Sequence, residues 1–132
     1  MTIDTAIIQM LLADAPVVAI VGDSIWPGSK PQASGYPAIV VNWIEGNPVY
    51  TNDGDSGLNN VRLELNCYGE TYTQAKDLAV AVKVLLSGFQ GANSGISIEN
   101  TLIASERDFR ESGSNADEYL FRVNLDLEVW FR

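Results

Sequence analysis

Oxygen-bearing side chains in the segment Asn52–Gly57 have the spacing with which calcium-binding loops begin. Asp53 and Asp55 stand at alternate positions there, and carboxylate oxygens are ligands that Ca²⁺ prefers. The glutamate that would close the ligand shell is absent at the matching distance. A polar connection between two strands therefore explains the segment better than a metal site does, and we expect no bound metal.

Three carboxylates, those of Glu64, Asp126 and Glu128, suggest a second kind of chemistry. Two carboxylates across a cleft form the acid and base of a glycosidase. All three residues lie at outward positions of predicted strands, which favours a solvated face over a catalytic pair. The chain also has no histidine, which removes the commonest general base and the usual serine and cysteine triads. We therefore expect no catalytic residues.

Neither the cysteine nor the serine of the glycine-rich turn has the surroundings of a nucleophile. Cys67 alternates in phase with Val61, Leu63 and Leu65, so a buried hydrophobic role is favoured over a reactive thiol. The turn Gly91–Gly95 lacks the spacing of a nucleophile elbow, and its serine has no histidine to act as base. Both features are interpreted as structural.

Aromatic residues favour contacts with protein over contacts with bases. Tyr36, Trp43, Tyr50 and Tyr68 lack the surrounding lysines and arginines that would hold a nucleic-acid backbone, so core packing or a protein interface is expected. Trp130 stands on the polar face of the last predicted strand, where an exposed indole often marks a protein contact. Burial under a loop is the alternative for Trp130, and the sequence leaves both open.

The composition is that of one globular domain with a large acidic excess. The chain has 132 residues, 46% of them hydrophobic and 19% charged, which is enough for one core and places residues 1–132 in one domain. There are 17 acidic and 8 basic residues, and the net charge of -9 argues against the usual nucleic-acid binder. A single cysteine forms no internal disulfide, which fits a reducing compartment.

Hydrophobic periodicity predicts both helices and strands. Thr71–Ser87 is the clearest helix, because its apolar residues share one face, Thr71 and Gln74 match a capping box, and Gly88 follows as a C-cap. Asp14 is expected to cap a short helix that ends at Gly22. The other expected elements are a helix at 2–12 and strands at 24–27, 36–45, 61–67, 96–107 and 119–131.

This order of elements predicts an α+β fold. A mainly antiparallel, possibly mixed, sheet is expected to pack one face on the long helix, with the short N-terminal helices beside it. The 36–45 strand is expected to be central in that sheet because it is apolar on both faces. Three segments are expected to be exposed loops, and they are Gly28–Gly35, Gly46–Asn60 and Ser105–Glu118.

Several short motifs stand in a characteristic order along the chain. They are VGDSIWP at 21–27, PQ at 31–32, YPAIVV at 36–41, LNCYG at 65–69, TY at 71–72 and the helical segment 75–86. In this order and spacing, followed by an alternating C-terminal strand, they resemble the tail-completion (tail terminator) family of long-tailed bacteriophages and prophages. The resemblance covers most of the chain.

The resemblance implies a structural role. A small α+β subunit of this kind would assemble into a hexameric ring that caps the tail tube, ends its polymerisation and provides the surface for head-tail joining. The implied partners are further copies of the chain, the tail tube protein and the head-tail connector or neck proteins, with no membrane and no cofactor. Genomic DNA would pass through the ring's lumen without specific binding, and an acidic lumen would repel it. The implied location is the tail-neck junction of the virion, after assembly in the host cytoplasm.

Interface residues are expected in the three predicted loops and on the last strand. The candidates are Lys30, Gln32, Asp53, Asp55, Arg107, Asp108, Arg110, Glu111 and Trp130. Two alternative functions stay open. The first is another neck or tail component, such as a head-completion or tube protein, and the second is a small acidic domain that binds a metal or ligand through Asp53 and Asp55.

Overall fold

The computed structural model describes residues 2–31, 35–93, 95–112 and 119–132. Three helices and six strands occur within these ranges. In chain order they are α1 (Ile3–Ala13), α2 (Ala15–Val21), β1 (Ile25–Pro27), β2 (Ala38–Thr51), β3 (Gly54–Gly69), α3 (Tyr72–Leu86), β4 (Gly91–Asn93), β5 (Ile96–Ser112) and β6 (Tyr119–Phe131).

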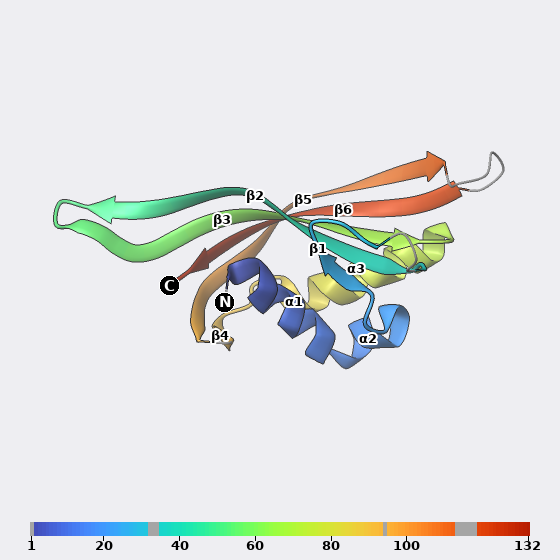
Figure 1. Ribbon diagram of the computed structural model, residues 1–132, viewed down its shortest axis with the longest axis horizontal. Helices are drawn as coiled ribbons and strands as arrows, with labels where there is room; N and C mark the ends of the chain where they lie inside the picture. The colour runs from blue at the N-terminus through green and yellow to red at the C-terminus, as the bar shows by residue number, and fades with distance from the viewer. Residues whose placement is uncertain (1, 32–34, 94, 113–118) are drawn as a thin grey trace.

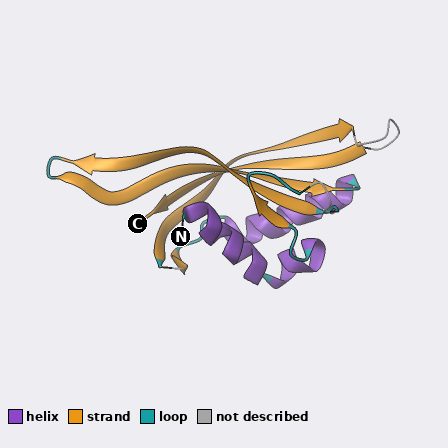
Figure 2. Ribbon diagram, in the orientation of Figure 1, coloured by secondary structure: helices purple, strands orange, loops and turns teal. Residues whose placement is uncertain are grey.

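The strands form one sheet in the order β1-β2-β3-β6-β5-β4. Only the β1/β2 pair is parallel, and the other neighbouring pairs are antiparallel. The helices all lie on one side of the sheet, and the opposite side carries none of the described helices (Figure 2). The α+β fold expected from the sequence is confirmed, with a sheet that is mixed but mostly antiparallel.

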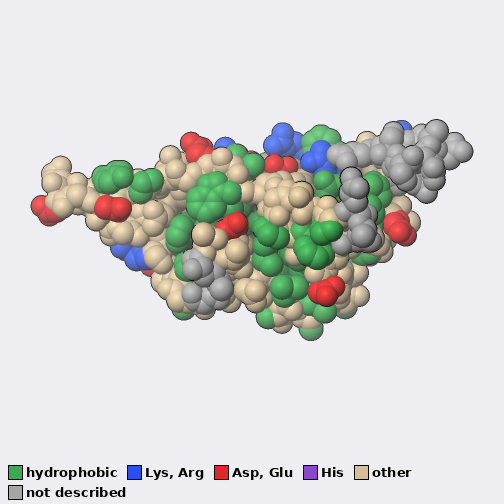
Figure 3. Space-filling model, viewed as in Figure 1, with side chains coloured by type: hydrophobic (Ala, Val, Ile, Leu, Met, Phe, Trp, Pro, Cys, Tyr) green, Lys and Arg blue, Asp and Glu red, His purple; other side chains and the backbone are tan. Residues whose placement is uncertain are grey.

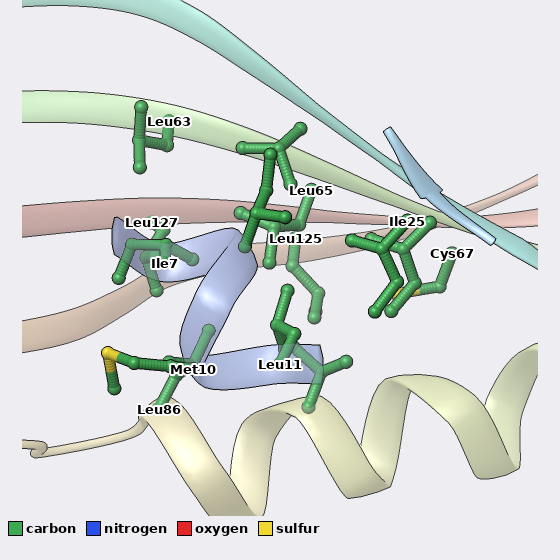
Figure 4. Close-up of a cluster of buried hydrophobic side chains, with 14 of the residues drawn as sticks. Ile7, Met10, Leu11, Ile25, Leu63, Leu65, Cys67, Leu86, Leu125 and Leu127 are labelled. Atoms are coloured by element: carbon green, nitrogen blue, oxygen red, sulfur yellow. The ribbon is translucent and has the colours of Figure 1, made fainter. Parts of the chain in front are cut away.

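The core lies between the helix layer and the inner face of the sheet, which is the face turned toward the helices. Alternate residues of β3 and β6, such as Leu65 and Leu125, point down onto Leu11 of α1 and Leu86 of α3 (Figure 4). These side chains are fully buried. The period of two along each strand therefore places one whole set of apolar residues in the core.

Local sequence signals set the helix ends. The carboxylate of Asp14 accepts a hydrogen bond from the Val17 amide at 3.3 Å, and Gly22 ends α2 with a positive φ. Thr71 caps α3 by accepting from the Gln74 amide at 3.1 Å. The Gln74 side chain accepts from the amide of Glu70, one residue before the cap, so the predicted box is displaced by one residue.

Two predicted loops are wrong. Gly46–Asn60 is a paired hairpin, in which Asn47 lies opposite Asn60 and Thr51 lies opposite Gly54. Strand β5 likewise continues to Ser112 and pairs with β6, so the predicted loop that began at Ser105 starts later than expected. The remainder of that segment, 113–118, lies outside the described residues.

The long strands create two hairpin arms that extend from the body in opposite directions (Figure 1). One is the β2–β3 arm, which we define as residues 44–60, and the other is the outer half of the β5–β6 hairpin. A bulge at Trp43/Glu45 marks the point where β2 enters the arm. The strand predicted to be central is β2, and it lies between β1 and β3 only up to Val41. Along the arm, β3 is its only described neighbour.

The lengths and compositions of the helices bear on whether they could cross a membrane. Among the described residues, no single helix is both long and apolar enough to span one. Helices α1 and α2 reach that length and composition only when taken together, and they meet at an angle of 87°.

Candidate interaction surfaces

Polar residues of β3 and β6 form a network on the outer face of the sheet, which is the face away from the helices. Arg62 donates a hydrogen bond to the carboxylate of Asp126 and forms an ion pair with it. Asn124 donates to the carboxylate of Glu64 and, at 3.0 Å, to the side-chain oxygen of Asn66. Asn66, Asn124 and Asp126 are buried, and each has a hydrogen-bond partner, so these side chains lie here without a large desolvation cost.

Arg122 links this network to the β5–β6 hairpin. Its guanidinium donates to Asn66 Oδ1 at 3.0 Å and lies 3.8 Å from a carboxylate oxygen of Glu64. The same guanidinium lies 4.4 Å from the ring centroid of Phe109, a cation–π distance. The outer face of β3, β6 and β5 is therefore tied together across its full width.

A hollow of about 260 Å³ opens over this network. It is lined by three arginines, two carboxylates, an asparagine and two apolar side chains, namely Arg62, Arg107, Arg122, Glu64, Asp126, Asn124, Ile44 and Phe109. Both apolar residues are substantially exposed, Ile44 at 51% and Phe109 at 40%. Several basic side chains, drawn in blue, lie along the upper edge of the molecule in the space-filling view (Figure 3).

Arg107 and Asp108 are neighbours in the chain but face opposite sides of the sheet. Arg107 pairs with Asn124 in the β5/β6 register and lines the outer hollow. Asp108 faces α3, where its carboxylate accepts a hydrogen bond from Lys76 Nζ at 2.7 Å. Of these two candidates, only Arg107 therefore faces the outer hollow.

Helix α3 is joined to β5 by a row of ion pairs. Glu106 accepts a hydrogen bond from Lys83 at 2.8 Å and lies 3.6 Å from Lys76, which also pairs with Asp108. The hydrogen bond from Lys83, and then the charges of both lysines, lower the pKa of Glu106 despite partial desolvation. The hydrogen bond to Asp108 is the main cause that raises the pKa of Lys76.

The β2–β3 arm carries acidic and aromatic side chains at its end. Asp53 and Asp55 are exposed near the turn, and Tyr50, which lies opposite Asp55 in the register, is 69% exposed. Red acidic atoms at the left end of Figure 3, and hydrophobic atoms farther along the arm, stand clear of the body. Within the described residues, no three His, Cys, Asp or Glu side chains are close enough to hold a metal ion.

Comparison with known proteins identifies the family. The sequence matches the family described as "Tail completion protein gp17" over residues 5–132. This chain belongs to that family. Membership makes it a structural component of the virion and not an enzyme.

Solved structures support the fold of this family member. One is a chain from "Virion of native gene transfer agent (GTA) particle", with a TM-score of 0.68 and 20% identity, covering 97% of this chain and 92% of that one. Another solved chain has a TM-score of 0.53 and 12% identity, with coverage of 96% and 92%. No curated protein matches the sequence significantly.

The remaining predicted interface residues of this tail completion protein are scattered. Lys30 is half-buried, with Nζ 4.5 Å from the ring centroid of Tyr36, and Trp130 is half-buried on the outer face. Arg110 is exposed on the β5–β6 hairpin. Gln32 and the side chain of Glu111 lie outside the described part of the chain. The structure therefore brings no more than a few candidates to any one surface.

Sequence reasoning misplaced one carboxylate and missed the outer-face network. Asp126 was expected on a solvated face, but it is only 8% exposed because Arg62 pairs with it. A signal was present in the sequence, since β3 and β6 each carry polar residues at four successive alternate positions in one phase. Cys67 is buried as expected, and burial raises the pKa of its thiol to about 12, with a smaller contribution from Glu106.

Proposed function

We propose that this protein closes into a hexameric ring on the end of the phage tail tube. The ring would stop the tube from growing and would offer the surface to which the head-side neck proteins attach. Membership of a family named for tail completion supports this role, and so does the likeness to a virion chain of a gene transfer agent. Its immediate partners would be the tail tube protein, the connector or neck proteins and further copies of itself.

The observation that carries the proposal is the β2–β3 arm. It extends beyond the helix layer and exposes large apolar side chains, with Trp43 at its base 49% exposed, Ile44 51% and Tyr50 69%. An exposed group of this kind costs free energy in a free monomer and is typical of a surface that a partner covers. A projecting arm is therefore a natural means for one subunit to reach its neighbours in an assembly.

The sheet also offers two different uncovered edges. Strand β2 has no described strand beside it beyond Val41, and β5 has none beyond Ile98, where its pairing with β4 stops. The Gly88 amide still donates a hydrogen bond to the Thr101 carbonyl, so the open part of the β5 edge lies beyond Thr101. A closed ring needs a head-to-tail interface that joins two unlike surfaces of the same chain. Opposite ends of one sheet meet that requirement, because their sequences and shapes differ.

The channel of such a ring would repel DNA. The chain carries a net charge of -9, and any share of it on the channel wall opposes binding of phosphates. DNA would then pass without being held. A ring structure with a basic channel wall would contradict this part of the proposal.

The test is polymerisation of purified tail tube protein with and without this protein, with tube length measured by electron microscopy. We expect shorter tubes that carry one ring at an end, and a ring mass of about six subunits by light scattering. Replacing Pro48–Asn59 by Asn-Gly makes a matched variant, because Asn47 and Asn60 are directly opposite and a two-residue turn fits there. This variant is expected to fold but not to cap tubes.

The same experiment separates the alternatives. A tube subunit would enter and lengthen the tubes, and a head-completion protein would bind the connector but leave tube length unchanged. A metal-binding domain would gain thermal stability in millimolar calcium through Asp53 and Asp55. We expect no shift of the unfolding temperature in calcium.

A further inference from the structure

The outer hollow holds one arginine that the network does not neutralise. Arg62 is paired with Asp126, and Arg122 lies against Glu64. The side chain of Arg107 is exposed and forms no ion pair or hydrogen bond with any described residue. Three arginines against two carboxylates give the hollow a positive excess in a chain whose net charge is -9.

The end of the β2–β3 arm has the complementary chemistry. Asp53 and Asp55 are exposed and belong to no ion pair within the described ranges. Asp55 uses one oxygen to accept the amide of Gly57 at 2.8 Å, which leaves its second oxygen available. Tyr50 faces the same side of the arm as Asp55, so a ring and a carboxylate are presented together.

We propose that the arm end of one copy docks into the outer hollow of a neighbouring copy. The carboxylates of Asp53 and Asp55 pair there with Arg107. The ring of Tyr50 covers the exposed apolar side chains of Phe109 and Ile44. This inference rests on the proposed ring and names the contact that closes it.

A second copy is the occupant that the geometry favours. Glu64 at the hollow lies nine positions along β3 from Asp55, and a rise of about 3.3 Å per residue places the arm end about 30 Å from its own hollow. The continuous β3 strand prevents the arm from folding back. Each copy therefore has one donor surface and one acceptor surface, which is the arrangement of a head-to-tail ring.

Charge reversal on each side tests the contact. Arg107→Glu, and separately the pair Asp53→Arg with Asp55→Arg, are each expected to raise the dissociation constant of self-association at least about tenfold. An equal mixture of the two variants is expected to restore association, because each reversed arm meets a reversed hollow and each native arm meets a native one. Sedimentation velocity over a concentration series measures both effects.

Matched controls separate this contact from a general charge effect. Arg110→Glu makes the same charge change on the same strand, but at a register position opposite Phe121 on the other face. Asp23→Arg with Asp77→Arg changes two exposed acids away from the arm. Both controls are expected to alter the dissociation constant less than threefold.

Cross-linking extends the test to weak association. Chains carrying Asp55→Cys and Arg107→Cys are mixed and oxidised, alone and on capped tubes, and the only native thiol is buried at Cys67. We expect a mixed disulfide well above that formed between Asp55→Cys and Arg110→Cys. Equal cross-linking of the two pairs, alone and on tubes, overturns the inference.

Further outcomes also decide between the contact and its alternatives. Rings and tube capping that survive both charge reversals overturn the arm contact and leave the proposed function standing. Failure of the wild type to cap tubes, with the 55–107 disulfide still formed, overturns the function and keeps the contact. Retention of short duplex DNA that Arg107→Glu abolishes, without any 55–107 disulfide, assigns the hollow to phosphates instead.

Discussion

Lys83 Nζ donates a hydrogen bond of 2.8 Å to Glu106 Oε2, which joins the last turn of helix α3 to strand β5. Lys76, two turns earlier, reaches the same carboxylate at 3.6 Å and Asp108 at 2.7 Å. These side chains are about one-third exposed, Lys83 at 31% and Glu106 at 28%. The row therefore holds the helix layer against the sheet at a border that water reaches, where each pair is worth little alone.

This row predicts a pH dependence of stability. The pKa of Glu106 is lowered below its ordinary value of 4.5, so its contribution is present above that value and is lost as the pH falls through the folded pKa. Glu106→Gln is expected to reduce the free energy of unfolding by about 0.5 to 1 kcal/mol at neutral pH. Urea titrations should show this difference disappear at acidic pH. Glu70→Gln, which changes an exposed carboxylate, should leave stability nearly unchanged, and a loss that persists in acid would contradict the prediction.

A pair of neighbouring leucines tests the core. Leu86 is fully buried, and Leu86→Ala is expected to cost about 2 to 5 kcal/mol of unfolding free energy because it leaves a cavity. Leu85 is only half-buried against the core, so Leu85→Ala should cost clearly less. Chemical denaturation measures both. Equal losses would mean that α3 packs through a different face.

Gly69 is a position where a side chain cannot fit. A Cβ atom built there would lie 2.6 Å from the backbone nitrogen of Ala75 and 3.1 Å from the carbonyl oxygen of Thr71. Gly69→Ala must therefore push the start of α3 away from β3, at a cost of about 1 to 3 kcal/mol. Gly35→Ala is the control, because a Cβ there meets nothing within 4 Å. Thermal unfolding of both variants checks the prediction.

Cys67 is expected to report global unfolding. Its side chain is fully buried and its thiol pKa is raised to about 12, so the native protein should not react with thiol reagents near neutral pH. Labelling should begin only where denaturant unfolds the chain, whereas Asp55→Cys should be labelled at once in the native state. Fast labelling of native Cys67 would indicate local opening of β3.

Features that depend on near neighbours in the chain could be predicted from the sequence. Strand β6 runs from Tyr119 to Phe131 as the alternation indicated, and α3 begins after Thr71 and ends before Gly88. Capping needs a side chain within a few residues of the helix end, and a half-buried strand needs only its own period of two. Such signals can be recognised without knowing which helices and strands pack together in the folded protein.

The strands of the β2–β3 arm could not be predicted from such local signals. Gly46–Asn60 has the composition of a loop, and most of it faces water, so no alternation marks it as strand. Its two halves are strands because their backbones pair with each other, from Asn47 opposite Asn60 out to Thr51 opposite Gly54. Cross-strand pairing stabilises a hairpin without a buried face, and composition does not record it.

For the candidate interface, too, some properties follow from the sequence and others follow only from the tertiary structure. The sequence alone determined the α+β pattern, the acidic excess and the lack of a histidine, because these depend on residue types and local spacing. Only the tertiary structure decided that Arg107 faces the outer hollow while Asp108 pairs with Lys76, and that Asp126 is buried beside Arg62. The reason is physical: a side chain's burial and charge partners are set by strands and helices far away in the chain, which the fold alone brings together.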